Sequence, residues 1–289
     1  MQILYRYRNF RFPAVFQEEK MKVKFVLLMV LAVIVAFGGS CSKKAEESSS
    51  LTIQKGVLLI GMEIGYPPME YYDADGKTPI GFDIDMGKAI TKKMGLEPKF
   101  VDTAWDGIFA GVNTGKYDCI MSSVTINAAR QAAHNFTKPY LANTLAMVLM
   151  KDTKITARTP EECAGLDVAF QSETTSDAYM MELAEGGLKF TPRRYEKVMY
   201  CFDELKLGRV DVIITDLPVA NDYVNVANSP FQIVWYNPEP ELFGICLKKG
   251  NDALTAALDK ALDELFADGT MVKISKTHFD ADLVSQARK

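Results

Sequence analysis

Residues 115–123, GKYDCIMSS, recur in outline as residues 208–216, GRVDVIITD. Each stretch contains a glycine at the expected end of a helix, a basic residue, an apolar residue, an aspartate and an apolar strand that ends in polar side chains. Chance similarity is the alternative, but both copies lie at the same point of a helix-to-strand unit. We therefore predict two lobes of similar construction, with one copy in each.

Strands and helices alternate from residue 57 to the end of the first copy. The apolar stretch 57–62, VLLIGM, predicts a buried strand, and 82–94 predicts an amphipathic helix that ends before Gly95. This order predicts an α/β fold made of two doubly wound lobes, each with a parallel sheet covered by helices. The other elements expected are a strand near 99–102, a helix across 107–115, a strand at 118–121, and a C-terminal amphipathic helix with Leu254, Leu258, Leu262 and Leu265 on one face.

Polar and aromatic side chains follow the predicted strands. In open parallel sheets, ligands bind outside the carboxyl ends of the strands, so these residues are candidates for one site. The stretch 120–130, IMSSVTINAAR, is the clearest case, because the strand stops in hydroxyls and an arginine follows. The candidates are Glu63 and Tyr66 after the first strand, Trp105 after the second, Ser122, Ser123, Thr125 and Arg130 after the third, Gln171, Thr174 and Thr175 after DVAF, and Asp216 after VIIT.

Each candidate also has a purely structural interpretation. Asn127 can cap a short helix, Ser and Thr are ordinary turn residues, and Arg130 can lie on the surface of that helix. Asp216 can cap the next helix, the two aromatic residues can belong to a core, and Glu63 can simply be solvated. Only the joint placement of these residues after successive strands favours a binding site.

A free amino acid would suit this set of side chains. Its α-carboxylate and α-ammonium groups both lose water on burial, and each must then be paired because an unpaired buried charge is costly. An arginine offers a planar fork that matches a carboxylate. The expected partners are Arg130 and the amides near Thr174 and Thr175 for the carboxylate, Asp216 with Ser122 and Ser123 for the ammonium, Tyr66 and Trp105 on either side of the side chain, and Glu63 at its far end.

Composition and motifs exclude several other classes. The chain has 289 residues and a net charge of −4 without a basic block, so nucleic acid is not an expected partner. Its five cysteines and two histidines show no metal-ligand spacing, and no P-loop, HExxH, GxSxG or GxGxxG motif is present, so no metal or cofactor is expected. Cys119 and Cys246 lie in apolar runs and are expected to be packed thiols, although one disulfide remains an option.

The beginning of the chain is typical of an export signal. From Met21, the expected true start, two lysines precede an apolar run at 25–37, which is shorter than the roughly 20 residues that span a bilayer. Cys41 follows small residues, as in bacterial lipoprotein signals whose cysteine is acylated, although Gly38 stands where leucine is usual. We expect a signal peptide and lipid-attachment site at 1–41 and a flexible tether at 42–50. An ordinary cleaved signal and an uncleaved anchor are the alternatives.

Five segments between residues 52 and 280 resemble one protein family, the bacterial extracellular solute-binding proteins that deliver polar amino acids to ABC importers. The resemblance implies a type II periplasmic-binding-protein fold, whose two lobes are joined by a two-strand hinge. It also implies a monomer that hands a free L-amino acid to a membrane permease outside the cytoplasm, without a cofactor. The segments are GMEIGYPPMEY (61–71), DGKTPIGFDIDMGKAI (75–90), YDCIMSSVTINAARQAAHNFTKPY (117–140), GRVDVIITD (208–216) and ADGTMVKISKTHF (267–279).

The resemblance also implies roles for individual residues, with two departures. Glu173 in QSETTS stands where the family usually has glycine; its carboxylate could face solvent or narrow the pocket, and it must adopt the backbone shape that glycine allows. Met69 stands where an aromatic residue is common, which would leave the pocket mouth more pliable. The implied roles are Ser122, Ser123, Thr125 and Arg130 for the α-carboxylate and ammonium, Asp216 for the ammonium, and Tyr66 and Trp105 as ring-stacking residues.

The hinge is expected near Asn143–Thr144 and Phe243–Gly244, giving lobe 1 at 51–143 and 244–289 and lobe 2 at 144–243. Glu63 favours a basic ligand such as arginine, lysine or histidine, although a glutamate can equally accept from the amide of glutamine. Two rival functions are a sensor that presents the amino acid to a membrane receptor, and a dehydratase on the same fold with Glu63 or Glu173 as general acid.

Overall fold

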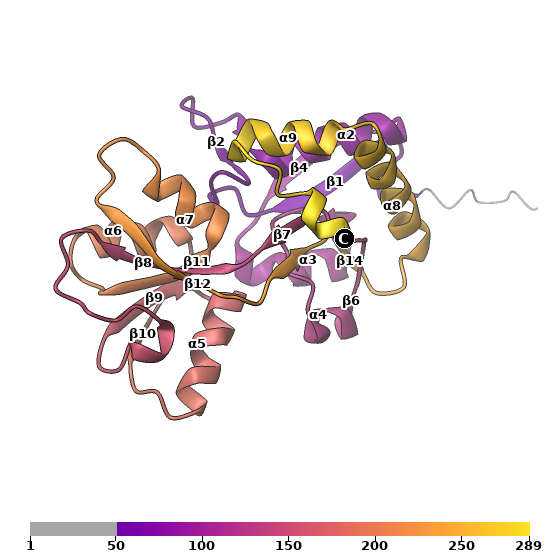
Figure 1. The fold of residues 1–289 in the computed structure, drawn as a ribbon. Helices are drawn as coiled ribbons and strands as arrows, with labels where there is room; N and C mark the ends of the chain where they lie inside the picture. The colour runs from indigo at the N-terminus through magenta and orange to yellow at the C-terminus, as the bar shows by residue number, and fades with distance from the viewer. Residues whose placement is uncertain (1–50) are drawn as a thin grey trace, which may run out of the picture. The chain divides into compact units, whose positions relative to one another are not determined.

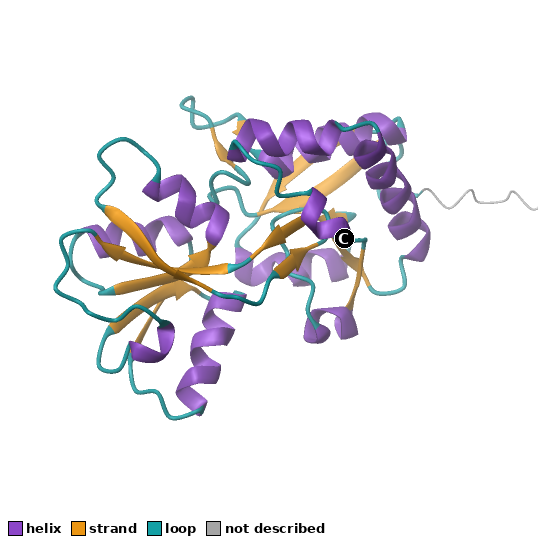
Figure 2. Ribbon diagram, in the orientation of Figure 1, coloured by secondary structure: helices purple, strands orange, loops and turns teal. Residues whose placement is uncertain are grey.

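The computed structural model describes residues 51–289. The predicted signal peptide at 1–41, the lipid-attachment residue Cys41 and the tether at 42–50 therefore lie outside the described residues. Within 51–289, no helix is long and apolar enough to cross a membrane. These residues form two α/β lobes, each built on a five-stranded sheet with helices against it (Figures 1 and 2).

The sheet of lobe 1 is assembled from both ends of the described chain. Its strand order is β4-β1-β5-β14-β6, with β1 parallel to β4 and β5, and β14 antiparallel to β5 and β6. The parallel arrangement predicted from the order of elements at 57–121 is confirmed for β1, β4 and β5, whereas β14, which enters this lobe after the chain has returned from lobe 2, makes the complete sheet mixed. The strands are β1 (Val57–Met62), β4 (Glu97–Asp102), β5 (Cys119–Ile120), β6 (His134–Phe136) and β14 (Cys246–Lys248).

Alternating residues of β1 explain why helices cover both faces of this sheet. Leu58 and Ile60 pack in one core with α2, α8 and α9, whereas Leu59 packs in a second core with α3. The strand at 57–62 and the helix at 82–94 are confirmed, and Gly95 takes the left-handed conformation that ends the helix. The helices are α2 (Phe82–Met94), α3 (Ile108–Thr114), α4 (Ala128–Ala133), α8 (Asp252–Ala267) and α9 (Thr270–Phe279).

Lobe 2 repeats this layered construction. Its strand order is β10-β9-β11-β8-β12, with α6 and α7 packed in one core and α5 in another (Figure 1). The strand β11 is parallel to β9 and antiparallel to β8. The elements are β8 (Leu145–Met150), β9 (Asp167–Gln171), β10 (Thr191–Tyr195), β11 (Val212–Asp216), β12 (Phe231–Tyr236), α5 (Thr175–Glu185), α6 (Val198–Lys206) and α7 (Leu217–Val224).

The repeated stretches have the same structural role in both lobes. Gly115 and Gly208 both take left-handed backbone angles, with φ of 77° and 69°. The aspartates that follow, Asp118 and Asp211, each accept a hydrogen bond from a backbone amide of the neighbouring strand, at 2.8 Å in lobe 1 and 2.9 Å in lobe 2. The pattern thus fixes the strands β5 and β11 in the middle of their sheets.

Two short strands lie where the chain passes between the lobes. β7 (Leu141–Asn143) and β13 (Glu241–Phe243) pair antiparallel, with Asn143 opposite Glu241. The crossings predicted near residues 143–144 and 243–244 fall at the ends of these strands. The remaining short elements are β2 (Tyr71–Tyr72), β3 (Pro79–Ile80) and the 3₁₀ turns at Trp105–Gly107, Pro160–Glu162 and Ser285–Arg288, and the four cysteines of the described part are buried free thiols.

Candidate ligand-binding site

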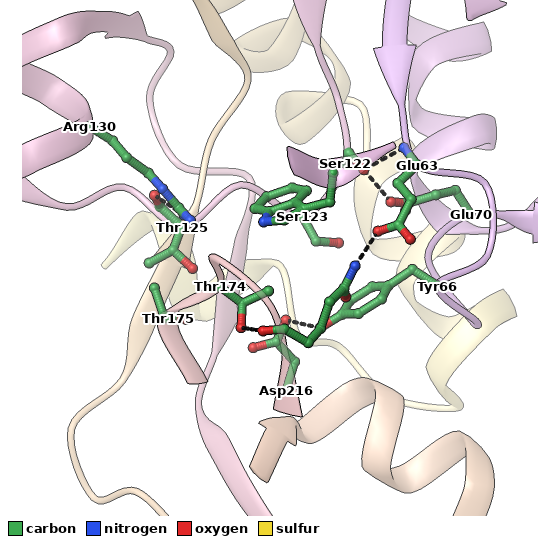
Figure 3. A pocket seen from close by; sticks show the side chains of 12 residues that line it. Glu63, Tyr66, Glu70, Ser122, Ser123, Thr125, Arg130, Thr174, Thr175 and Asp216 are labelled. Carbon is green, nitrogen blue, oxygen red and sulfur yellow. Dashed lines mark hydrogen bonds between the residues drawn. The ribbon is translucent and has the colours of Figure 1, made fainter. Parts of the chain in front are cut away.

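One pocket collects side chains from the carboxyl ends of β1, β5, β9 and β11 (Figure 3). Every site residue predicted from the sequence lines it, and Glu70 is the one addition. Ten of the lining side chains are labelled in Figure 3. The lining residues are Glu63, Tyr66, Glu70, Trp105, Ser122, Ser123, Thr125, Arg130, Gln171, Thr174, Thr175 and Asp216.

Arg130 lies at one end of the pocket, and the helix cap helps to hold it there. Asn127 caps α4 as the structural interpretation predicted, because its Oδ1 accepts a hydrogen bond from the backbone amide of Arg130 at 2.9 Å. The guanidinium donates to the carbonyl oxygen of Thr125 at 3.1 Å and lies 5.5 Å from the ring centroid of Trp105 and 5.2 Å from that of Phe109. The capping and binding interpretations of this stretch are therefore compatible.

Asp216 occupies the N-cap position of α7, but its side chain does not cap the helix. Its two carboxylate oxygens accept hydrogen bonds from the hydroxyl of Tyr66 at 2.6 Å and from Nδ2 of Asn143 at 2.7 Å. Burial, and then the charge of Glu241, raise the pKa of Asp216 to about 7 against the effect of those hydrogen bonds. Asp216 as a whole residue is only 8% exposed, so a cation entering the pocket would meet an acid with little solvent around it.

Two glutamates lie at the other end of the pocket. Oε2 of Glu63 accepts a hydrogen bond from Nε2 of Gln171 at 2.6 Å, and burial raises the pKa of this carboxyl to about 7. The hydroxyl of Ser122 accepts from the backbone amide of Glu63 at 3.1 Å and donates to Oε1 of Glu70 at 2.5 Å. Ser122 therefore joins the two glutamates, and the hydrogen that its hydroxyl can donate is committed to Glu70.

Glu70 forms a buried carboxyl pair with Asp83. Oδ2 of Asp83 accepts from the backbone amide of Ser123 at 2.9 Å and from the hydroxyl of Tyr140 at 3.2 Å. Within the described residues, Oε2 of Glu70 and Oδ1 of Asp83 are buried without a hydrogen-bond partner. Burial and mutual repulsion raise the pKa of Glu70 well above its usual value, and burial raises that of Asp83 to about 7. Two adjoining buried carboxyls have their lowest free energy when they share one proton.

The sequence interpretation missed Glu70, Asp83, Asn143 and Glu241. The two acids of the pair lie in segments that were singled out for their resemblance, but neither follows a predicted strand of the main sheet. Glu241 lies beside the pocket on the hinge strand β13, and its Oε2 accepts three hydrogen bonds, at 3.1 Å, 3.1 Å and 3.2 Å. The signal in the sequence that could have identified Glu241 was an acidic residue close to a predicted crossing between the lobes. The three donors are the hydroxyls of Thr125 and Thr175 and Nδ2 of Asn143.

The two departures from the family pattern have different outcomes. Glu173 takes a left-handed backbone with φ of 61°, as glycine would, and its side chain is exposed rather than lining the pocket. Its carbonyl oxygen accepts a hydrogen bond from Nε1 of Trp105 at 3.2 Å. The prediction for Met69 is wrong, because Met69 is fully buried in the core of lobe 1 and does not reach the pocket.

Comparisons with known proteins find relatives that match most of this chain. The sequence pattern of "Bacterial extracellular solute-binding proteins, family 3" matches residues 58–281. The L-cystine-binding protein TcyJ of Escherichia coli (strain K12) is 28% identical over 258 residues, which cover 89% of this chain and 96% of that protein.

Two solved structures are similar at the level of fold and sequence. An ancestral arginine-binding protein bound to arginine has a TM-score of 0.74 and 34% identity, covering 78% of this chain and 99% of that one. The ancestral amino acid-binding protein AncCDT-1, a precursor of cyclohexadienyl dehydratase, has a TM-score of 0.72 and 32% identity, covering 78% and 96%. Each similarity extends over both lobes rather than over one of them.

Proposed function

The chain belongs to family 3 of the bacterial extracellular solute-binding proteins, and from that premise we propose that it captures a free L-amino acid between its lobes for delivery to the permease of an ABC importer. The observation that carries this proposal is the order of charges along one pocket. Arg130 lies at one end, Asp216 lies on the wall contributed by lobe 2, and Glu63 lies at the other end. A zwitterion with a polar side chain needs partners in that order.

Under this proposal each lining residue has a definite role. Arg130 holds the α-carboxylate through its planar fork, and Asp216 holds the α-ammonium. Closure of the two lobes around the ligand, through the hinge strands β7 and β13, couples binding to recognition by the permease. The other proposed contacts are Thr125, Thr174 and Thr175 with the carboxylate, Ser122 and Ser123 near the ammonium, Tyr66 and Trp105 beside the side chain, and Gln171 with Glu63 at its far end.

A basic amino acid is the preferred ligand class. Among the described residues that line the pocket, Glu63 and Asp216 stand against one cation, Arg130, whereas Glu70 is paired with Asp83. A ligand with one extra positive charge therefore leaves the fewest charges unpaired. The ancestral relative is described as bound to arginine, which supports the same choice, whereas TcyJ is described as binding cystine. Glutamine is the neutral competitor, because its amide could donate to Glu63 at the same place.

Thermal shift against the twenty amino acids tests this proposal. The protein is first partly unfolded and refolded to remove carried-over ligand. A ligand at 1,000 times its Kd adds about 4 kcal/mol to the free energy of unfolding, or roughly 8–16 °C at this size. A shift confined to basic amino acids is the expected result. No shift with any amino acid would overturn the proposal.

We also propose that the exported protein is a monomer anchored to the membrane through a lipid on Cys41, which becomes the first residue after the signal peptide is cleaved between Ser40 and Cys41. The tether at 42–50 would then hold the two lobes outside the cytoplasm. Metabolic labelling with a palmitate analogue should mark the wild-type protein and not a Cys41→Ser variant. Transport is tested separately, with cells that are given a radiolabelled amino acid to which the protein binds. Uptake of this amino acid should stop when the permease gene is deleted; uptake that continues would favour a sensor role with a membrane receptor.

A dehydratase activity is the second candidate, because AncCDT-1 is described as a precursor of such an enzyme. Of the two general acids considered from the sequence, Glu173 is exposed and does not line the pocket, so only Glu63 fits that role. Its pKa of about 7 would keep part of the carboxyl protonated near neutral pH. Product formation from a prephenate-like substrate, lost in Glu63→Gln, would support the enzyme over the receptor.

A further inference from the structure

Glu241 binds two hydroxyls that the proposed ligand also needs. Its Oε2 lies 3.1 Å from Oγ1 of Thr125 and 3.1 Å from Oγ1 of Thr175. A threonine hydroxyl has one hydrogen to donate, and in this geometry both hydrogens go to Glu241. A ligand carboxylate placed between the two threonines could therefore receive their hydrogen bonds only if Glu241 released them.

The position of Glu241 also connects the two lobes. Thr125 follows β5 in lobe 1, whereas Thr175 opens α5 in lobe 2, and Glu241 lies on the hinge strand β13 between them. Nδ2 of Asn143, on the paired hinge strand, is a third donor to the same oxygen at 3.2 Å. The carboxylate thus holds one hydroxyl from each lobe next to the hinge, where a bound amino acid would bring the lobes together.

The carboxylate of Glu241 and the α-carboxylate of the proposed ligand would also compete for the same positive charge. The positive charge of Arg130 acts on Glu241 and would be the main partner of the ligand carboxylate. Within the described residues, Arg130 forms no ion pair to a carboxylate within 4.0 Å, so its guanidinium is not tied to Glu241. A second negative charge beside it would repel the first one in a half-buried site.

We propose that Glu241 is an internal competitor for the α-carboxylate of the ligand: it occupies the hydroxyls of Thr125 and Thr175, draws the lobes together without a ligand, and lowers affinity for amino acids. This inference rests on the proposed function, since it assumes that the ligand carboxylate binds at this end of the pocket. It makes Glu241 an affinity-determining residue outside the lining of the pocket.

Calorimetric titration of wild type and Glu241→Gln with L-arginine tests the competition. The variant removes the charge and should lower the Kd for arginine by about tenfold. Agmatine, which is arginine without its carboxylate, should show no such gain, because it has nothing for Glu241 to compete with. The matched control is Glu239→Gln, which removes an exposed acidic charge two residues earlier and should leave both values unchanged.

A second measurement needs no ligand. Small-angle scattering of the protein stripped of amino acids should give a larger radius of gyration for Glu241→Ala than for wild type, because the bridge between the lobes is lost. Glu241→Ala also serves as the binding variant if Glu241→Gln does not fold, as judged by circular dichroism.

The outcomes separate this inference from the proposed function. Weaker arginine binding by a folded Glu241→Gln, or an equal gain for agmatine, would overturn the competition while leaving the receptor intact. An unchanged radius of gyration would overturn the bridging role. If the wild type binds no amino acid, the proposed function fails and the competition fails with it, and scattering alone then decides whether Glu241 links the lobes.

Discussion

The two ends of the pocket differ in charge and in how their side chains are supported. Arg130 is the cation at one end and is held by a helix cap and a backbone carbonyl, which are local contacts. Glu63 and Glu70, at the other end, are held by Gln171 and Ser122, which lie far away in the sequence. Under the proposed function, the first end would bind the groups that every amino acid carries, and the second would bind the side chain that distinguishes one amino acid from another.

Loss of the cationic end should have the largest effect. Arg130→Ala is expected to raise the Kd of arginine and of glutamine alike by about a hundredfold or more, because truncating one partner of a buried charge pair leaves the other charge unpaired. Calorimetric titration with both ligands measures this. The Kd values of Arg130→Lys should lie between those of the wild type and those of Arg130→Ala, because lysine keeps the positive charge but not the planar fork of the guanidinium.

The matched control for that variant is Arg209→Ala, since Arg209 is an exposed arginine paired with Glu204 in lobe 2. It should bind both ligands as the wild type does. If Arg130→Ala weakened arginine but not glutamine, the two ends would have been assigned the wrong way round.

Neutralising the acidic end should have a smaller and more selective effect. Glu63→Gln is expected to raise the Kd of arginine by at least about tenfold. The cationic side chain of the ligand would then donate its hydrogen bond to a neutral amide oxygen instead of a charged carboxylate. The Kd of glutamine should change by less than about threefold, because its amide can pair with either side chain. Competition between the two ligands for one protein sample gives the ratio directly. Equal losses for both would show that Glu63 supports the pocket rather than selecting its ligand.

The acidic end should also make stability depend on pH. Burial raises the pKa values of Glu63 and Asp83 to about 7, whereas the unfolded chain releases these protons near pH 4. Between these values the folded protein binds more protons than the unfolded chain, so the free energy of unfolding falls as pH rises from about 5 to 8. Without a ligand, the Tm should therefore be higher at pH 5.5 than at pH 8. The difference should be roughly 2–4 °C for each kcal/mol by which the free energy of unfolding differs between the two pH values.

Glu70→Gln tests whether the carboxyl pair is part of that dependence. Glutamine can donate to Asp83 without a shared proton, so the Tm of this variant should vary less between pH 5.5 and pH 8. Glu239→Gln, an exposed neutralisation, should keep the wild-type dependence. A variant curve parallel to that of the wild type would remove Glu70 and Asp83 from the explanation.

Local signals explain why so much of the fold and the pocket could be predicted. Strand β1 is apolar throughout, α2 ends at a left-handed Gly95, and polar residues directly follow their strands, so neighbouring residues carry the information. The remainder depends on contacts between distant segments. Glu241 contacts Asn143 across 98 residues of sequence, and β14 joins the sheet of lobe 1 only after the chain has passed through lobe 2. The carboxyl pair of Glu70 and Asp83 could not be predicted either, because only the fold brings these two residues together.

The smallest expected effect concerns the backbone that frames the cationic end. Glu173 precedes the two threonines of α5 and holds a left-handed conformation that costs an ordinary residue about 1–2 kcal/mol. Glu173→Gly removes that strain but adds freedom to the unfolded chain, so a net gain of about 1 kcal/mol or less is expected in urea unfolding. The Kd for arginine should not change, because the side chain of Glu173 is exposed and only its carbonyl oxygen meets the site, through Trp105. A change in affinity would mean that the conformation of this turn, and not only the side chains after it, sets how the carboxylate is held.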